Sequence, residues 1–153
     1  MTGISGLLIW NIAVSIFCYF RLHKRKQLFD DRYANTMTNT ATLGITLVLG
    51  MHVTVLMSAG LPIVFLINLL LGAAIGALFG ALVKYHSVLI GLYNGLIGIS
   101  MGVMIGEVLK NPQICSIPIS DHTQILLNMV QLCTFATLLL TVVTGLILYS
   151  MKV

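Results

Sequence analysis

One carboxylate stands near the end of an otherwise apolar stretch, and its chemistry is the first question that this sequence raises. Residues 94–110 read NGLIGISMGVMIGEVLK, and Glu107 is one of only four acidic residues in the chain. A charged side chain at the centre of a membrane helix costs roughly 2.5–3.5 kcal/mol, and less near an interface. Ionisable residues inside membrane segments commonly carry protons or bind ions. Glu107 is therefore the first candidate for a titrating group.

Other uncommon polar residues are expected at a similar depth, in the outer half of the membrane. They come from the other predicted helices, and a methionine lies one turn before Glu107. We expect an ion- or proton-binding pocket formed by Glu107, His52, Asn68, Asn128, Gln131 and Met104. A simpler alternative remains open. Glu107 reaches the outer interface and pairs with Lys110, its neighbour three residues further along the helix.

The remaining residues that could do chemistry do not form a recognisable motif. Methionines accompany His52 and Cys133 in the apolar segments, but no pair has metal-ligand spacing; they are Met51, Met57, Met101 and Met104. Methionine is a normal filler of apolar helices. The sequence has no phosphate-binding loop, metal finger or haem signature. We therefore expect no metal, no cofactor and no enzymatic activity.

The composition predicts what kind of elements hold these residues. The chain of 153 residues is 58% hydrophobic and only 8% charged, whereas an average soluble domain is about 25% charged. A membrane helix needs about 20 mostly apolar residues. We predict an all-α, polytopic membrane protein with a single domain over residues 1–153. Its five predicted helices cover residues 3–20, 38–59, 62–83, 88–109 and 123–150.

The predicted breaks between helices have physical causes. Gly60 is suited to a left-handed helix end, and Pro62 suits a first helical turn. Residues 62–109 as one helix would be about 70 Å long, more than twice the hydrocarbon thickness of about 30 Å. A turn is therefore expected at residues 84–87. Asp121 and Gln124 have the spacing of an N-cap pair before the last helix.

The basic residues predict the orientation. With five spans, seven of the eight lysines and arginines fall on one side of the membrane, and only Lys110 falls on the other. Cytoplasmic loops carry such an excess, so we expect the N-terminus outside and the C-terminus in the cytoplasm of a prokaryotic cell. The loop 21–37 carries five of the seven, which predicts an anchor to anionic lipid rather than nucleic-acid binding. These five are Arg21, Lys24, Arg25, Lys26 and Arg32.

Glycines recur at helical spacing in the third and fourth predicted helices. Glycine lets the backbones of two membrane helices approach closely, so we predict that these two helices form a tight central hairpin. Tyr93, Ser100 and Glu107 share the face nearly opposite the glycines, which predicts that the fourth helix lies at the centre of the bundle. The glycines are Gly72, Gly76, Gly80, Gly91, Gly95, Gly98, Gly102 and Gly106.

Two classes of function remain open. In the first, the protein is a small transporter or channel component for a cation or proton, with Glu107 as the titrating group. In the second, it is a non-catalytic accessory or scaffold subunit that assembles with itself or another membrane subunit through its glycine faces. The first class predicts that the outer polar groups converge around a cavity. The second predicts that they point apart, or that the glycine faces lie outside the bundle.

Overall fold

A computed structural model describes residues 2–25, 31–57, 60–83, 85–112 and 122–150. The described chain is all-helical, and its five helices are long and apolar enough to cross a membrane. They are α1 (Thr2–Arg25), α2 (Asp31–Leu56), α3 (Leu61–Gly80), α4 (Tyr85–Lys110) and α5 (His122–Ser150). The prediction of an all-α chain with five apolar helices is confirmed at this level.

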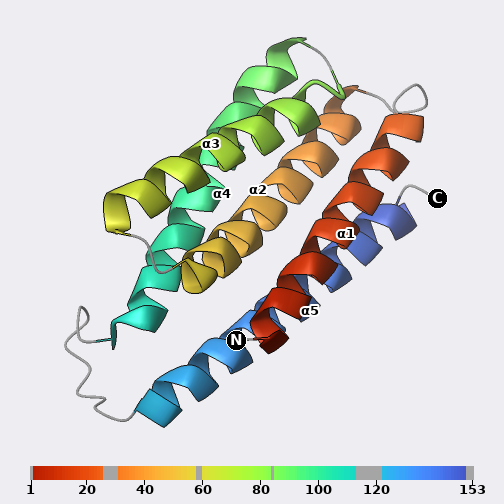
Figure 1. Ribbon diagram of the computed structural model, residues 1–153. Helices are drawn as coiled ribbons and strands as arrows, with labels where there is room; N and C mark the ends of the chain where they lie inside the picture. Colours follow the sequence, from red (N-terminus) through yellow and green to blue (C-terminus); the bar gives the residue numbers. More distant parts are fainter. Residues whose placement is uncertain (1, 26–30, 58–59, 84, 113–121, 151–153) are drawn as a thin grey trace.

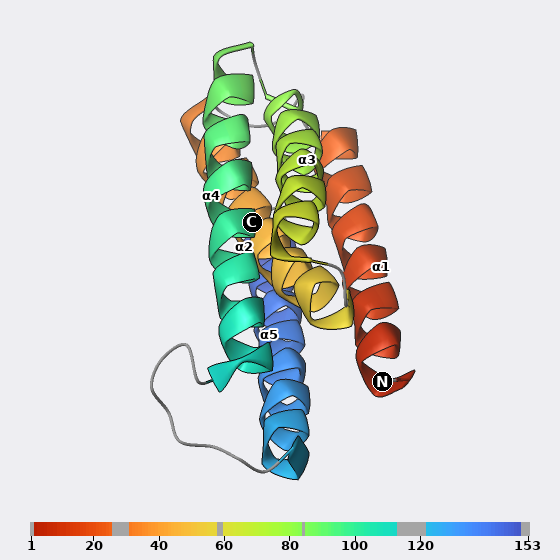
Figure 2. The ribbon, with the colours of Figure 1, turned by 60° about the vertical axis from the view of Figure 1, so that its left-hand side comes forward.

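α2 is the central helix, and it contacts each of the other four (Figures 1 and 2). Within its most apolar window 56% of α2 is buried, against 33% for α4. The prediction that the fourth helix lies at the centre is therefore wrong. Tyr93 of α4 is 66% exposed, so the face opposite the glycines points away from the bundle. The hydroxyl of Ser100 donates to the carbonyl of Leu96 one turn back, and needs no partner from another helix.

The first two helices run further than predicted. α1 continues to Arg25 and α2 begins at Asp31, so the expected loop 21–37 is largely helical. Charged residues do not by themselves end a helix, and a helix can continue past the apolar span into a polar surrounding. The C-terminal end of α1 lies at the same end of the bundle as the start of α4 and the end of α5 (Figure 1).

The boundaries around α3 follow from proline and glycine. Pro62 occupies the first turn of α3, as predicted, and the preceding Gly60 is the N-cap residue. Gly60 has φ −59°, so the expected left-handed conformation does not occur. α3 ends at Gly80, a few residues before the predicted end, and α4 begins at Tyr85. The interval between these helices, residues 81–84, therefore has the predicted length of four residues but lies three residues earlier than predicted.

The glycines of α4 face two different helices. In the first half of α4, the backbone of Gly91 lies against Gly76 and Gly80 of α3, and that of Gly95 against Gly72 and Gly76. In the second half, Gly98 and Gly102 lie against the backbone of α2, and Gly106 lies against Thr54 and Met51 of α2. The α4 glycines thus meet α3 at one end of the helix and α2 at the other.

Threonines line the buried side of α2. Thr38, Thr42 and Thr46 are four residues apart, and each hydroxyl donates to the carbonyl four residues earlier in the helix. Their polar atoms are thereby satisfied without a partner on another helix, which suits a buried position in an apolar bundle. Near the start of α2, Ser87 of α4 donates to the side-chain oxygen of Asn35 at 2.9 Å.

Candidate functional site

Glu107 lies near the C-terminal end of α4, with its side chain 15% exposed. Its carboxylate pairs with the ammonium group of Lys110 at 3.6 Å. The same Lys110 Nζ donates to the backbone carbonyl of Met57, just beyond the end of α2, at 2.5 Å. A cation at a helix C-terminus is favourable because the free carbonyls there carry partial negative charge. Glu107 thus helps to hold a lysine that links the ends of α4 and α2.

Three of the proposed pocket residues point away from the bundle. Met104 is 71% exposed, and Asn128 and Gln131 of α5 are also exposed. Asn128 and Gln131 lie on the side of α5 opposite Cys133 and Thr137, which are buried against the rest of the bundle. No residue in the described part of the chain forms a hydrogen bond with either amide. These residues therefore do not join Glu107 in one pocket.

Asn68 is fully buried between α3 and α2. Its side-chain nitrogen donates to the carbonyl of Val64 at 2.9 Å and to the hydroxyl of Thr54 on α2 at 3.4 Å. Its side-chain oxygen has no hydrogen-bond partner among the described residues. Thr54 is also the residue against which Gly106 of α4 packs. Asn68 therefore belongs to a small contact between α2, α3 and α4.

His52 lies on a different side of α2, in a polar cluster with Asn11 of α1 and Thr137 of α5. His52 and Asn11 are fully buried. Asn11 Nδ2 donates to Thr137 Oγ1 at 3.1 Å and lies 3.4 Å from His52 Nε2. These contacts join residues that are 41 and 126 positions apart in the chain. The cluster is the one place where polar side chains of α1, α2 and α5 meet among the described residues.

The hydrogen bonds determine which nitrogen of His52 carries the proton. His52 Nδ1 lies 2.9 Å from the carbonyl of Val48, which can only accept, so Nδ1 is the donor. Nε2 of the neutral ring is then an acceptor that faces Asn11 and Thr137. The side-chain oxygen of Asn11 has no partner among the described residues. The cluster therefore combines a ring nitrogen that can bind a proton with an unused buried acceptor beside it.

The sequence pointed to His52 as a site residue but not to its partners Asn11 and Thr137. Asn11 is an amide in the middle of an apolar segment, which is an uncommon residue at that depth. This was a usable signal. Thr137 gave none, because threonines recur throughout the last helix and bond to their own helix backbone, as Thr137 does to Cys133 at 2.8 Å.

Two of the five basic anchor residues can be placed with their side chains. Arg21 and Lys24 are exposed at the C-terminal end of α1, and the Arg21 guanidinium lies 5.3 Å from the centre of the Phe17 ring. Lys26 lies outside the described residues, as do the side chains of Arg25 and Arg32 and the predicted cap residue Asp121. Among the described residues, no group of three or more potential metal ligands occurs.

The comparisons with known proteins give no relative. No family model, curated protein or solved structure matches the chain. Any assignment of function must therefore come from the geometry of the described residues.

Proposed function

We propose that this protein is a non-catalytic, membrane-embedded subunit that assembles through the exposed amide face of α5. The five helices have the length and composition of membrane spans. The excess of basic residues at one end supports a cytoplasmic location for the C-terminus and an outside location for the N-terminus. The bilayer then surrounds the exposed apolar side chains of the spans that lie outside this contact.

The observation that carries this proposal is the amide face itself. Gln124, Asn128 and Gln131 are all exposed and lie on one stripe of α5. An unsatisfied polar group in hydrocarbon costs several kcal/mol, whereas a hydrogen bond between membrane helices contributes about 0.6–2 kcal/mol. An amide stripe directed at lipid is therefore unfavourable unless another polar helix covers it.

A second copy of this chain is the partner that fits best. A primary amide carries both a donor and an acceptor, so it can pair with an identical amide. Two parallel copies of α5 related by a two-fold axis bring each amide of the stripe close to its own equivalent. The contact is then self-complementary, and no other protein is needed to supply hydrogen bonds to these amides.

The glycines of α3 and α4 pack inside the bundle and do not form the assembly surface in this proposal. Glycines of α3 and α4 lie against backbone atoms of α2, α3 and α4, so they are not free to meet another subunit. We infer that they hold the central hairpin and α2 together by close packing. The assembly surface is thus α5, whereas the sequence had pointed to the glycine stripes.

Disulfide cross-linking in native membranes tests the assembly. The variant Asn128→Cys is expected to form a covalent dimer on oxidation. It is made in a Cys115→Ser background, so that this native cysteine, which follows the fourth predicted helix, does not cross-link instead. The matched control is Val130→Cys, which is also exposed on α5 but two residues away and therefore about 160° around the helix. Equal cross-linking at both positions, or none at position 128, would show that the amide face is not the contact.

A second function, proton movement, is favoured by one separate observation. The unused side-chain oxygen of Asn11 lies in the same buried cluster as the acceptor nitrogen of His52. When Nε2 takes up a proton, it becomes a donor, and rotation of the Asn11 amide presents an acceptor to it. The expected result is proton uptake by proteoliposomes that His52→Gln abolishes and Asn128→Leu leaves intact. Uptake that survives His52→Gln would exclude this role.

A further inference from the structure

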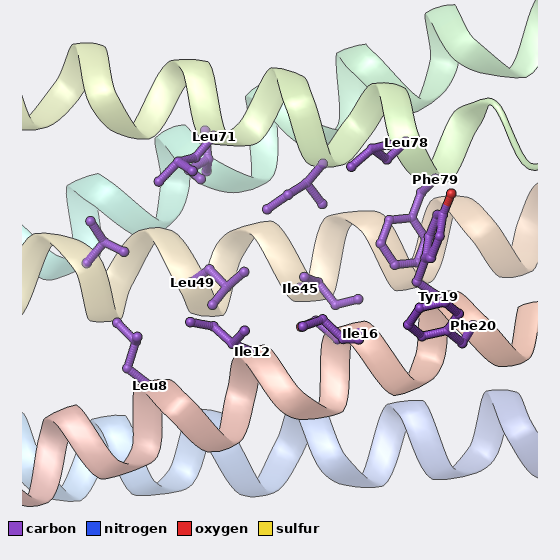
Figure 3. Close-up of a pocket in the computed structure, with 14 residues that line it drawn as sticks. Leu8, Ile12, Ile16, Tyr19, Phe20, Ile45, Leu49, Leu71, Leu78 and Phe79 are labelled. Atoms are coloured by element: carbon purple, nitrogen blue, oxygen red, sulfur yellow. The ribbon is translucent and has the colours of Figure 1, made fainter.

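An apolar groove runs between α1 and α3, with α2 as its floor. Its volume is about 580 Å³. Figure 3 shows Leu49 of α2 at the floor, Ile12 and Ile16 of α1 on one wall, and Leu71 and Leu78 of α3 on the other. α1 and α3 make little direct contact along this length. The groove exists because both helices pack on α2 with little packing between them.

The groove is open on its outer side and narrowed at one end. The wall residues Ile16 and Leu78 are about half exposed, whereas Ile45 of the floor is fully buried. At the end near the C-terminus of α1, the rings of Tyr19 and Phe79 meet edge to face with their centres 5.5 Å apart. In a bilayer, the open side faces lipid directly, and the aromatic contact narrows the groove between α1 and α3 at this end.

The length of the groove fits one acyl chain. Its residues on α1 run from Leu8 to Phe20, which corresponds to about 18 Å at 1.5 Å per residue. One leaflet contributes about 15 Å of hydrocarbon. A single extended hydrocarbon chain is the occupant whose length agrees with the groove.

Basic residues follow the groove at its narrowed end. His23 is exposed and stacks on the groove residue Tyr19, with ring centres 6.0 Å apart. Lys24 is exposed and lies one turn beyond Phe20, which also lines the groove. Arg21 instead lies over Phe17, which does not line the groove. An apolar groove that ends at basic side chains is complementary to a lipid with an anionic headgroup.

We propose that this groove binds one anionic phospholipid from the leaflet at the C-terminal end of α1. One acyl chain lies between α1 and α3 on the floor of α2, and the phosphate contacts His23 and Lys24. The site requires membrane insertion but not the dimer proposed above, because α5 contributes no residue to the groove.

Native mass spectrometry of the full chain in detergent measures the binding. The probes are phosphatidylglycerol and phosphatidylcholine with identical acyl chains, titrated separately. We expect one bound phosphatidylglycerol per chain, with higher affinity than for phosphatidylcholine. Leu49→Trp fills the floor of the groove and should weaken binding at least about tenfold, or about 1.4 kcal/mol. The control Leu89→Trp adds the same side chain at a position on α4 that is 76% exposed and outside the groove.

Two further variants keep the result interpretable. Ile12→Trp obstructs the groove from its exposed wall, so it tests the site if Leu49→Trp does not fold. Lys24→Gln should retain the bound lipid but lose the preference for phosphatidylglycerol, whereas Arg21→Gln should keep that preference. Unchanged lipid binding by both groove-filling variants overturns the proposal. A protein dimer that disappears in those variants, with no lipid bound to the wild type, also overturns it and assigns the groove to a second copy.

Discussion

Gly76→Ala tests whether the close approach of α3 and α4 stabilises the bundle. A Cβ atom at this position would meet the backbone carbonyl oxygen of Gly91 first. The next atoms are the carbonyl carbon of Gly91 and the Cα of Leu92, both at 3.0 Å, or 0.4 Å closer than ordinary contact at 3.4 Å. All three are backbone atoms of a helix and have no rotamer to change. The added methyl group therefore has to push α4 as a whole away from α3.

The expected magnitude follows from two opposing effects. Overpacking a tightly packed contact typically costs about 1–3 kcal/mol. Replacing glycine by alanine inside a helix gains up to about 1 kcal/mol through helix propensity. We therefore expect Gly76→Ala to lower the free energy of unfolding by up to about 2 kcal/mol after the full propensity gain is subtracted. Gly145→Ala is the matched control, because a Cβ there meets nothing within 4 Å, and it should be neutral or slightly stabilising.

Unfolding of the purified protein in mixed micelles by added SDS, followed by circular dichroism, measures both variants. The difference between Gly76→Ala and Gly145→Ala removes the shared effect of propensity and isolates the contact. Equal unfolding free energies for the two variants would refute the close-packing interpretation of the glycine stripes. The same result would mean that α3 can move away from α4 without loss of stability.

Three further predictions concern other parts of the bundle. Lys110→Gln should destabilise the protein more than Glu107→Gln in the same unfolding assay, because of these two residues only the lysine contacts the Met57 carbonyl just beyond the end of α2. The Glu107 variant should lose less than about 1 kcal/mol, and the reverse order would be inconsistent with the lysine as the linking residue. Asn11→Leu should lower the free energy of unfolding by about 1–3 kcal/mol, since it removes the amide that donates to the buried Nε2 of His52. An unchanged unfolding curve would contradict the hydrogen-bonded cluster. In a Cys115→Ser background, a membrane-impermeant thiol reagent applied to intact cells should label Asn111→Cys and not Lys24→Cys, and the opposite pattern would reverse the proposed orientation.

Local features of the chain were readable from the sequence. The number of helices follows from the lengths of the apolar runs, and Pro62 marks the start of α3 because its ring geometry suits a first helical turn. The pairing of Glu107 with Lys110 was one of two alternatives, and it depends only on a spacing of three residues along one helix. The exact helix ends were less predictable, since charged residues such as Arg21 continue a helix as readily as they flank it.

The arrangement of the helices was decided by tertiary packing. Asn68 and Asn128 are both amides predicted at similar depth, yet Asn68 is buried against α2 and Asn128 is exposed. Sequence spacing determines the depth of a side chain and its angle relative to others on the same helix. The rotation of each helix against its neighbours depends on contacts between distant segments, such as those of Asn11 with His52 and Thr137. For the same reason, the glycines of α4 predicted close packing with another helix, but not that α2 as well as α3 packs against them. α2 is the centre of the bundle because its neighbours pack on several of its sides at once.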